Sequence, residues 1–185
     1  IEGKDRDNFK NSGILPNKKI APFRQLPVLD VDGKIFAQTG AIARFCGKLS
    51  GLYPKDDDLA AARIDQVIEV AQDINYLFTL SSRDKEKEKL KLARKILATK
   101  HLPKYFNFLE NLIKENDNSL FFVGENISIA DLAIWRLLGW FESGIIDGVS
   151  TNILEPYENL KKMRNEIYKH SKVNDWMIKT YGKVI

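Results

Sequence analysis

Hydrophobic and polar positions change their period along the chain near residues 50–58. Before this point, short apolar runs alternate with prolines and glycines. The runs "PVLDV" (27–31) and "KIFA" (34–37) predict two short β-strands. Between them lies Asp32-Gly33, a dipeptide typical of a tight hairpin turn. We therefore expect a β-hairpin over residues 27–37.

From Gln38 onward the apolar positions follow a helical period. Ile42, Phe45, Cys46 and Leu49 stand at i, i+3, i+4 and i+7, which places them on one helix face. On this pattern Cys46 is an inert core thiol. After "GLYPKDDD" (51–58), amphipathic segments continue almost to the end of the chain. They cover residues 59–80, 84–115, 128–143 and 155–168, with a short one at 173–180.

These patterns predict a small α/β domain followed by an all-helical domain. We expect the first domain over residues 1–50, a linker over 51–58 and the helical domain over 59–185. A chain of 185 residues with 44% hydrophobic content is long enough to bury a core in such an arrangement. No repeat or low-complexity segment is evident.

Composition narrows the function classes. No run of 18 apolar residues exists, so no membrane span is expected. The 29 basic and 25 acidic residues leave a net charge of +4, too slight to indicate nucleic-acid binding. A single cysteine and no apolar signal segment fit a reducing, cytoplasmic location. His101 and His170 are isolated from other ligand types, so no metal site is predicted.

Two short pieces near the hairpin are candidates for ligand binding. Leu26-Pro27 precedes the first strand. On its residues alone a trans proline opening an edge strand is favoured, whereas a cis bond would turn the Leu26 backbone toward an extended peptide. Gln38-Thr39 lies at the start of the predicted helix. There Thr39 either caps its own helix, or helps the free amides to hold a carboxylate.

Three motifs in this order resemble those of glutathione S-transferases. "PFRQLPVLDVDGKIFAQTGAIARF" is similar to the end of their thioredoxin-like domain. "GLYPKDDDLAAARIDQVIE" resembles their linker and first C-terminal helix, and "NISIADLAIW" resembles their later Ser/Thr-x-x-Asp motif, here Ser128 and Asp131. The sigma class, which includes prostaglandin D synthase-like enzymes and lens S-crystallins, is the most similar. The resemblance implies a partial thioredoxin-like domain and an all-helical C-terminal domain.

The resemblance also assigns roles around glutathione. It implies that Leu26, before a cis Pro27, pairs with the cysteinyl part and that Gln38 and Thr39 hold the γ-glutamyl carboxylate. Gln25 would lie along the tripeptide. Lys18 would contact the glycyl carboxylate; the alternative is a free surface lysine. Asp73 would reach the glutathione amino group in the partner subunit; the alternative is an ordinary helix carboxylate.

Two positions depart from the family pattern. The Trp that sigma-like chains carry four residues before the lysine is Ile14 here, with Phe9 further upstream, so the glycyl-end loop is altered. The catalytic Tyr of the family has no match in residues 1–24, and it is expected upstream of Ile1. No catalytic residue is therefore assigned within this chain.

The expected activity is a glutathione transferase that activates the glutathione thiol for attack on a hydrophobic electrophile. A related glutathione-dependent isomerase or peroxidase activity belongs to the same expectation, as do a homodimer and the absence of a metal. The alternative is a non-catalytic relative, crystallin-like or a scaffold, which keeps the fold. The resemblance gives no reason to expect nucleic-acid or membrane partners.

Overall fold

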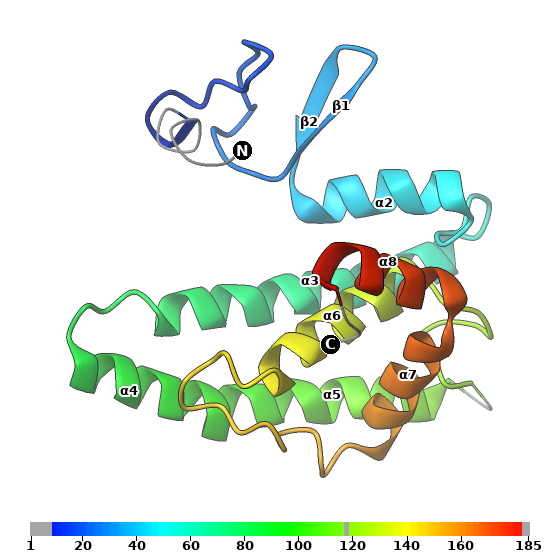
Figure 1. Cartoon of the computed structure of the whole chain (residues 1–185). Coiled ribbons are helices and arrows are strands. Elements are labelled where there is room, and N and C mark those ends of the chain that lie inside the picture. The colour runs from blue at the N-terminus through cyan, green and yellow to red at the C-terminus, as the bar shows by residue number, and fades with distance from the viewer. Residues whose placement is uncertain (1–8, 117–118, 183–185) are drawn as a thin grey trace. The chain divides into compact units, whose positions relative to one another are not determined.

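The computed structural model describes residues 9–116 and 119–182, and the chain divides into two compact units, Ile1–Gly51 and Leu52–Ile185. The order of the elements can be followed in Figure 1. The first unit holds a two-stranded sheet and one long helix. The second unit is helical throughout. Among the described helices, none is both long and apolar enough to cross a bilayer.

The first unit contains the predicted hairpin. Strands β1 (Val28–Val31) and β2 (Lys34–Ala37) pair antiparallel, with Val28 opposite Ala37 and Val31 opposite Lys34. Both turn residues have positive φ, 49° at Asp32 and 84° at Gly33. Two consecutive positive φ values match the right-handed twist of the strands, and Asp-Gly tolerates them. The predicted hairpin is confirmed.

A short apolar cluster holds the segment before the hairpin in place. Its buried members are Phe9, Leu15 and Ala21, and Val28 and Ile35 of the hairpin pack against them. Gly13 allows the chain to turn here, because its φ is +71° and a Cβ would lie 2.5 Å from Cγ of Arg24. Only glycine fits such a close approach with positive φ.

Helix α2 (Thr39–Ser50) follows the hairpin and ends at Gly51 in the left-handed conformation. Phe45 packs edge-on against Phe36 of β2, with ring centroids 5.2 Å apart. Cys46, in contrast, is exposed, so the expectation of a core thiol is wrong. Leu49 on the same face is 74% exposed. The two strands of the hairpin are narrow, and they cover the face at Phe45 but not as far as Leu49.

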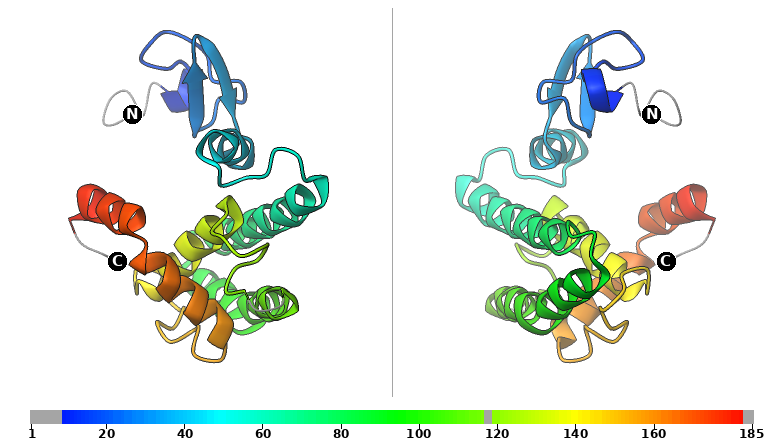
Figure 2. Two further views of the ribbon diagram at one scale, coloured as in Figure 1. Left: turned by 90° about the vertical axis from the view of Figure 1, so that its right-hand side faces the viewer. Right: turned by 90° about the vertical axis from the view of Figure 1, so that its left-hand side faces the viewer.

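The second unit is a helical bundle, seen in two further views in Figure 2. Its elements are α3 (Asp58–Ser81), α4 (Lys87–Ile96), the π-helical turn η1 (Leu97–His101), α5 (Leu102–Glu115), α6 (Ile129–Glu142), α7 (Glu158–Lys169) and α8 (Ser171–Tyr181). Helix α3 packs against α6, α4 and α5. Helices α5 and α6 pack against α7, which also contacts α8.

Helix α6 supplies much of the core of this unit. Ile134, Leu138 and Phe141 are fully buried, and the helix is apolar on most sides. Its start is fixed by a capping box. The Ser128 hydroxyl accepts from the Ala130 amide, and the Asp131 carboxylate accepts from the Ser128 amide at 2.8 Å. The Ser-x-x-Asp spacing predicted this start.

The segment predicted as one helix over 84–115 is divided. Helix α4 begins only at Lys87, and η1 separates it from α5. Proline lacks an N–H and cannot complete the regular helical ladder. Just before Pro103, the Leu102 amide donates to the carbonyl of Leu97, five residues back, which is the π pattern. The amphipathic period alone did not reveal this break.

Residues of the predicted linker are held by the helical unit. The Leu52 carbonyl accepts from the Ile129 amide at 3.0 Å, and the Tyr53 hydroxyl donates to Asp65 at 3.0 Å. Asp57 then caps α3 by accepting from the Ala60 amide. The division between the two units accordingly falls between Gly51 and Leu52.

Candidate functional site

The N-terminus of α2 has three backbone amides without a partner. Its first internal bond runs from the Ile42 amide to the Gln38 carbonyl, and no side chain caps the helix. Among the described residues, none accepts from the amides of Thr39, Gly40 or Ala41. The first turn also contains no acidic residue. Free amides and the positive end of the helix dipole favour a bound carboxylate here.

Gln38 and Thr39 take positions that self-capping does not explain. Gln38 occupies the N-cap position with φ 77° and ψ 121°, a conformation rarely adopted by residues other than glycine. Thr39 is already the first helical residue, and its exposed hydroxyl makes no capping bond. The interpretation of Thr39 as the cap of its own helix is therefore wrong. The hydroxyl is left available to a ligand.

The Leu26-Pro27 peptide bond is cis. The trans bond favoured by the residues alone is wrong, and the cis bond implied by the family resemblance is present. Leu26 itself is half exposed, at 48%. Its backbone N–H and carbonyl make no hydrogen bond to any other described residue. An extended peptide could therefore pair with Leu26 in the manner of an added strand.

These two features line one small cavity of the first unit, with a volume of about 50 Å³. Five of its lining residues are ones that the sequence singled out: Gln25, Leu26, Pro27, Gln38 and Thr39. Phe23 and Ala37 complete the lining, and sequence reasoning missed both. Phe23 is an exposed aromatic residue next to the RQLP motif, which is the one signal that could have indicated it.

Lys18 is not part of this lining. It lies in the turn of residues 14–20, where Ile14 bridges Ile20, and it has φ 65°. Its side chain is exposed and forms no ion pair within the described ranges. The Lys18 side chain is thus exposed to solvent. Among the described residues it neither lines the cavity nor forms an ion pair.

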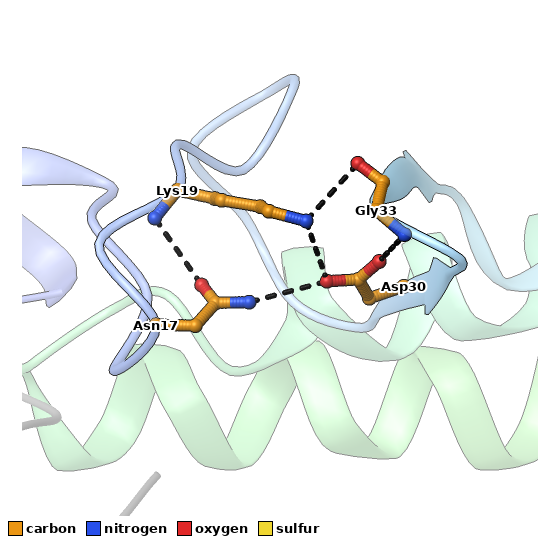
Figure 3. A network of polar contacts seen from close by, with 4 residues as sticks. All are labelled: Asn17, Lys19, Asp30 and Gly33. Carbon is orange, nitrogen blue, oxygen red and sulfur yellow. Dashed lines mark hydrogen bonds and ion pairs between the residues drawn. The ribbon is translucent and has the colours of Figure 1, made fainter.

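The neighbouring lysine is engaged instead, in the network of Figure 3. Lys19 Nζ lies 3.0 Å from Oδ2 of Asp30 and donates to the Gly33 carbonyl, also at 3.0 Å. Asn17 donates to the same carboxylate, which also accepts from the Gly33 amide. The bond from Lys19 is the largest influence that lowers the pKa of Asp30. The network ties the 14–20 turn to the hairpin.

Asp73 belongs to the helical unit. It is exposed on α3, and its charge acts on Tyr105 of α5. Burial raises the pKa of Tyr105, and the negative charge of Asp73 raises it further. The carboxylate is therefore in contact with solvent and lies near Tyr105 of its own chain.

The two residues considered as substitutes for the family's Trp lie in different environments. Phe9 is 4% exposed and belongs to the apolar cluster of the first unit, whereas Ile14 is 48% exposed. Neither lines the cavity. Across the described part of the chain, no group of three metal-ligating side chains is assembled.

The arrangement at the cavity suits binding of a short anionic peptide. One end offers an unpaired backbone edge at Leu26, and the other offers free helix amides with a hydroxyl at Thr39. All six tyrosines of the sequence lie in the helical unit. None of the described residues that line the cavity carries a carboxylate, imidazole, amine, thiol or phenol.

Comparison with known proteins gives a consistent set of relatives. Residues 72–180 match the family model of the glutathione S-transferase C-terminal domain. A glutathione S-transferase of Plasmodium yoelii yoelii is 33% identical over 141 residues, which are 76% of this chain and 64% of the relative. Glutathione S-transferase 1 of Ascaris suum is 29% identical over 166 residues, 86% of this chain and 76% of the relative.

A solved structure, prostaglandin synthase D of Nilaparvata lugens, matches with a TM-score of 0.81 and 25% identity. The match covers 97% of this chain and 82% of that one. The chain thus spans less than two thirds of the Plasmodium relative and about four fifths of the solved structure.

Proposed function

Because the chain belongs to the glutathione S-transferase family, we propose that its first unit binds glutathione and that the protein transfers it to a hydrophobic electrophile. The observation that carries this proposal is the cavity at α2. There, the unpaired backbone of Leu26 and the free amides at Thr39 line the same space. Glutathione has an extended backbone and a carboxylate on its γ-glutamyl part, so it can satisfy both.

Each residue then has a defined part in holding the tripeptide. Thr39 donates its hydroxyl and its amide to the γ-glutamyl carboxylate, and Gln38 presents its backbone beside it. Leu26 pairs with the cysteinyl residue, and Gln25 lies along the peptide. Lys18 reaches the glycyl carboxylate from the turn that Lys19 holds in place.

The chemistry requires a thiolate. A free thiol with a pKa of about 8.5 is largely protonated at neutral pH. A hydroxyl that donates to sulfur favours the thiolate and lowers that pKa. In this proposal the hydroxyl is that of the family's catalytic tyrosine, and none of the residues that line the cavity is a tyrosine.

The second substrate is a hydrophobic electrophile. Its carbon forms a bond to the glutathione sulfur, and a leaving group such as halide departs with its electron pair. Where the carbon belongs to an activated double bond, the π electrons instead take up a proton. The protein acts in the cytoplasm as a homodimer, in which Asp73 of the partner subunit approaches the glutathione amino group. The exposure of this carboxylate on α3 supports this role, because a buried carboxylate could not reach a ligand.

The test compares Thr39→Val with Thr39→Ser. Valine removes the hydroxyl but keeps the branched shape, and serine keeps the hydroxyl. Loss of one hydrogen bond to a charged group costs about 1.5–3 kcal/mol, so we expect Thr39→Val to weaken glutathione binding about 10- to 100-fold. Thr39→Ser should stay within about threefold. Isothermal titration calorimetry measures both, and equal affinity of wild type and Thr39→Val would overturn the site.

Turnover is measured separately, as conjugation of glutathione to an aryl halide. The protein used includes any residues encoded upstream of Ile1. Conjugation that falls in Thr39→Val in parallel with glutathione affinity supports the transferase. Tight glutathione binding with no turnover would instead indicate a non-catalytic, scaffold-type relative.

A further inference from the structure

The helical unit contains a second, larger cavity, of about 640 Å³. It is lined by α4, by the ends of α3 and α6, and by residues 145–148 after α6. Ligand pockets of proteins commonly have volumes of about 300–1,000 Å³. The volume therefore suits a small molecule with some ten to twenty heavy atoms, and all of its lining belongs to one unit.

The interior of this cavity is apolar and aromatic. Phe78 of α3 and Trp140 of α6 meet edge-to-face, with ring centroids 4.2 Å apart. Leu90 of α4 and Ile145 of the loop face the same space, and Ile145 is 77% exposed. An exposed apolar side chain beside an aromatic wall favours a ligand with a hydrocarbon body.

One rim of the cavity is cationic. Lys87, Lys91 and Arg94 stand at i, i+4 and i+7 on α4, so they share one face of the helix. Asp147 is the single acidic residue in the lining. Neither Lys87 nor Lys91 forms an ion pair with another described residue. Lys89 on the same helix, in contrast, pairs with Glu86 at 2.7 Å. The rim therefore carries an excess of positive charge toward the cavity.

Arg94 joins the cationic rim to the aromatic wall. Its guanidinium carbon lies 4.1 Å from the Phe78 ring centroid, and one Nη donates to the Ser82 hydroxyl at 2.7 Å. Its other Nη is buried without a hydrogen-bond partner among the described residues. Burial lowers the pKa of Arg94, and the charge of Asp147 raises it in part. A buried donor without an acceptor is costly, and an incoming anion would reduce that cost.

We infer that this cavity binds a small amphiphile with an apolar body and one anionic head group, a carboxylate or sulfonate. The body lies against Phe78 and Trp140, and the head group lies between Lys91 and Arg94. This inference goes beyond glutathione transfer, because it needs only residues of the helical unit and no bound glutathione.

Decanoate and decan-1-ol are the probes, because they share a hydrocarbon chain and differ in charge. By titration calorimetry we expect one decanoate site per chain. Lys91→Gln and Arg94→Gln should each weaken decanoate binding about 3- to 10-fold and change decan-1-ol binding less than twofold. Lys95→Gln is the matched control, since Lys95 lies on α4 outside the lining and carries the same charge. It should leave both affinities unchanged.

Leu90→Trp fills the cavity and should weaken both probes about tenfold. Thr39→Val should not change decanoate binding, so the outcome is independent of the glutathione site. Absence of decanoate binding at millimolar concentration would overturn the inference. Equal losses of decanoate affinity in Lys91→Gln and Lys95→Gln would also overturn it. Equal losses of decanoate and decan-1-ol affinity in Lys91→Gln would overturn it as well. Lys91 is exposed, so Lys91→Gln remains informative even if circular dichroism shows a lowered melting temperature for Arg94→Gln.

Discussion

At the scale of single residues, Gln38 departs from local preference where the cavity is formed. Its φ of 77° costs a non-glycine residue about 1–3 kcal/mol. Such strain persists only where the surrounding structure imposes it. Here Gln38 follows directly on Ala37, the last residue of β2, and Thr39 begins α2. The strained residue leaves the first amides of α2 open to the cavity instead of to a capping side chain.

Lys18 and Lys19 are adjacent cations with different surroundings, and this difference is testable. Lys19 is bound to Asp30 and Gly33, whereas Lys18 has no such contact. We expect Lys18→Gln to weaken glutathione binding about 3- to 10-fold, and high salt should reduce this loss because the lysine is exposed. Calorimetric titration at low and high salt measures it. An unchanged affinity at low salt would remove Lys18 from the site.

Lys19→Gln is the matched control for that experiment, and it should lower the stability of the folded protein. Lys19 holds the pKa of Asp30 below its ordinary value, so the contact stabilises the folded state above that value. The stabilisation is lost as the pH falls through the lowered pKa. The melting temperature of Lys19→Gln should therefore lie below that of the wild type at neutral pH, and the difference should shrink in acid.

At the scale of elements, α7 is capped by a residue of another helix. Its N-cap Tyr157 supplies no side-chain bond. Instead the buried Glu110 of α5 accepts from the amides of Asn159 and Leu160 and from the Asn159 side chain, the last at 2.7 Å. Burial raises the pKa of Glu110, but these hydrogen bonds outweigh it and leave the pKa lowered. One carboxylate thus fixes α5 against α7.

Glu110→Gln should therefore destabilise the protein by about 1–3 kcal/mol at neutral pH, because an amide accepts on one side only. A lowered folded-state pKa stabilises above the unfolded value of Glu and loses its effect below it. The difference between variant and wild type should accordingly shrink as the pH falls below about 4.5. Urea unfolding at several pH values measures it. Lys114→Gln, which removes an exposed partner 3.6 Å from Glu110, should cost only about 0.5 kcal/mol.

At the scale of the whole molecule, the proposed dimer places Asp73 at the partner's glutathione. Asp73→Asn should then weaken glutathione binding about tenfold, since a charge-assisted contact is lost. Tyr105→Phe is the matched control, because it removes a hydroxyl near Asp73 but keeps the carboxylate. It should change the affinity by less than threefold.

Sedimentation equilibrium provides the independent measurement for this arrangement, with a dimer as the expected result. A monomer that binds glutathione would contradict the contribution from the partner subunit. Equal effects of Asp73→Asn and Tyr105→Phe would assign Asp73 to packing within its own helical unit.

The sequence by itself determined the local elements. Two short apolar runs on either side of Asp32-Gly33 predicted the hairpin, and Ser128-x-x-Asp131 predicted the start of α6. The helical period predicted each long helix among the described residues, although not the break before Pro103. These features depend on residues a few positions apart, so the sequence displays them directly.

Only the tertiary structure decided the features that join distant residues. Such features are the cis bond and the strained Gln38 at one cavity, the capping of α7 by Glu110 from 49 residues away, and Arg94 over Phe78. The exposure of Cys46 was also decided there, because it depends on how much of α2 the hairpin covers. The burial of a side chain, its hydrogen-bond partners and the unpaired amides all depend on contacts between elements. A local sequence period therefore does not predict them.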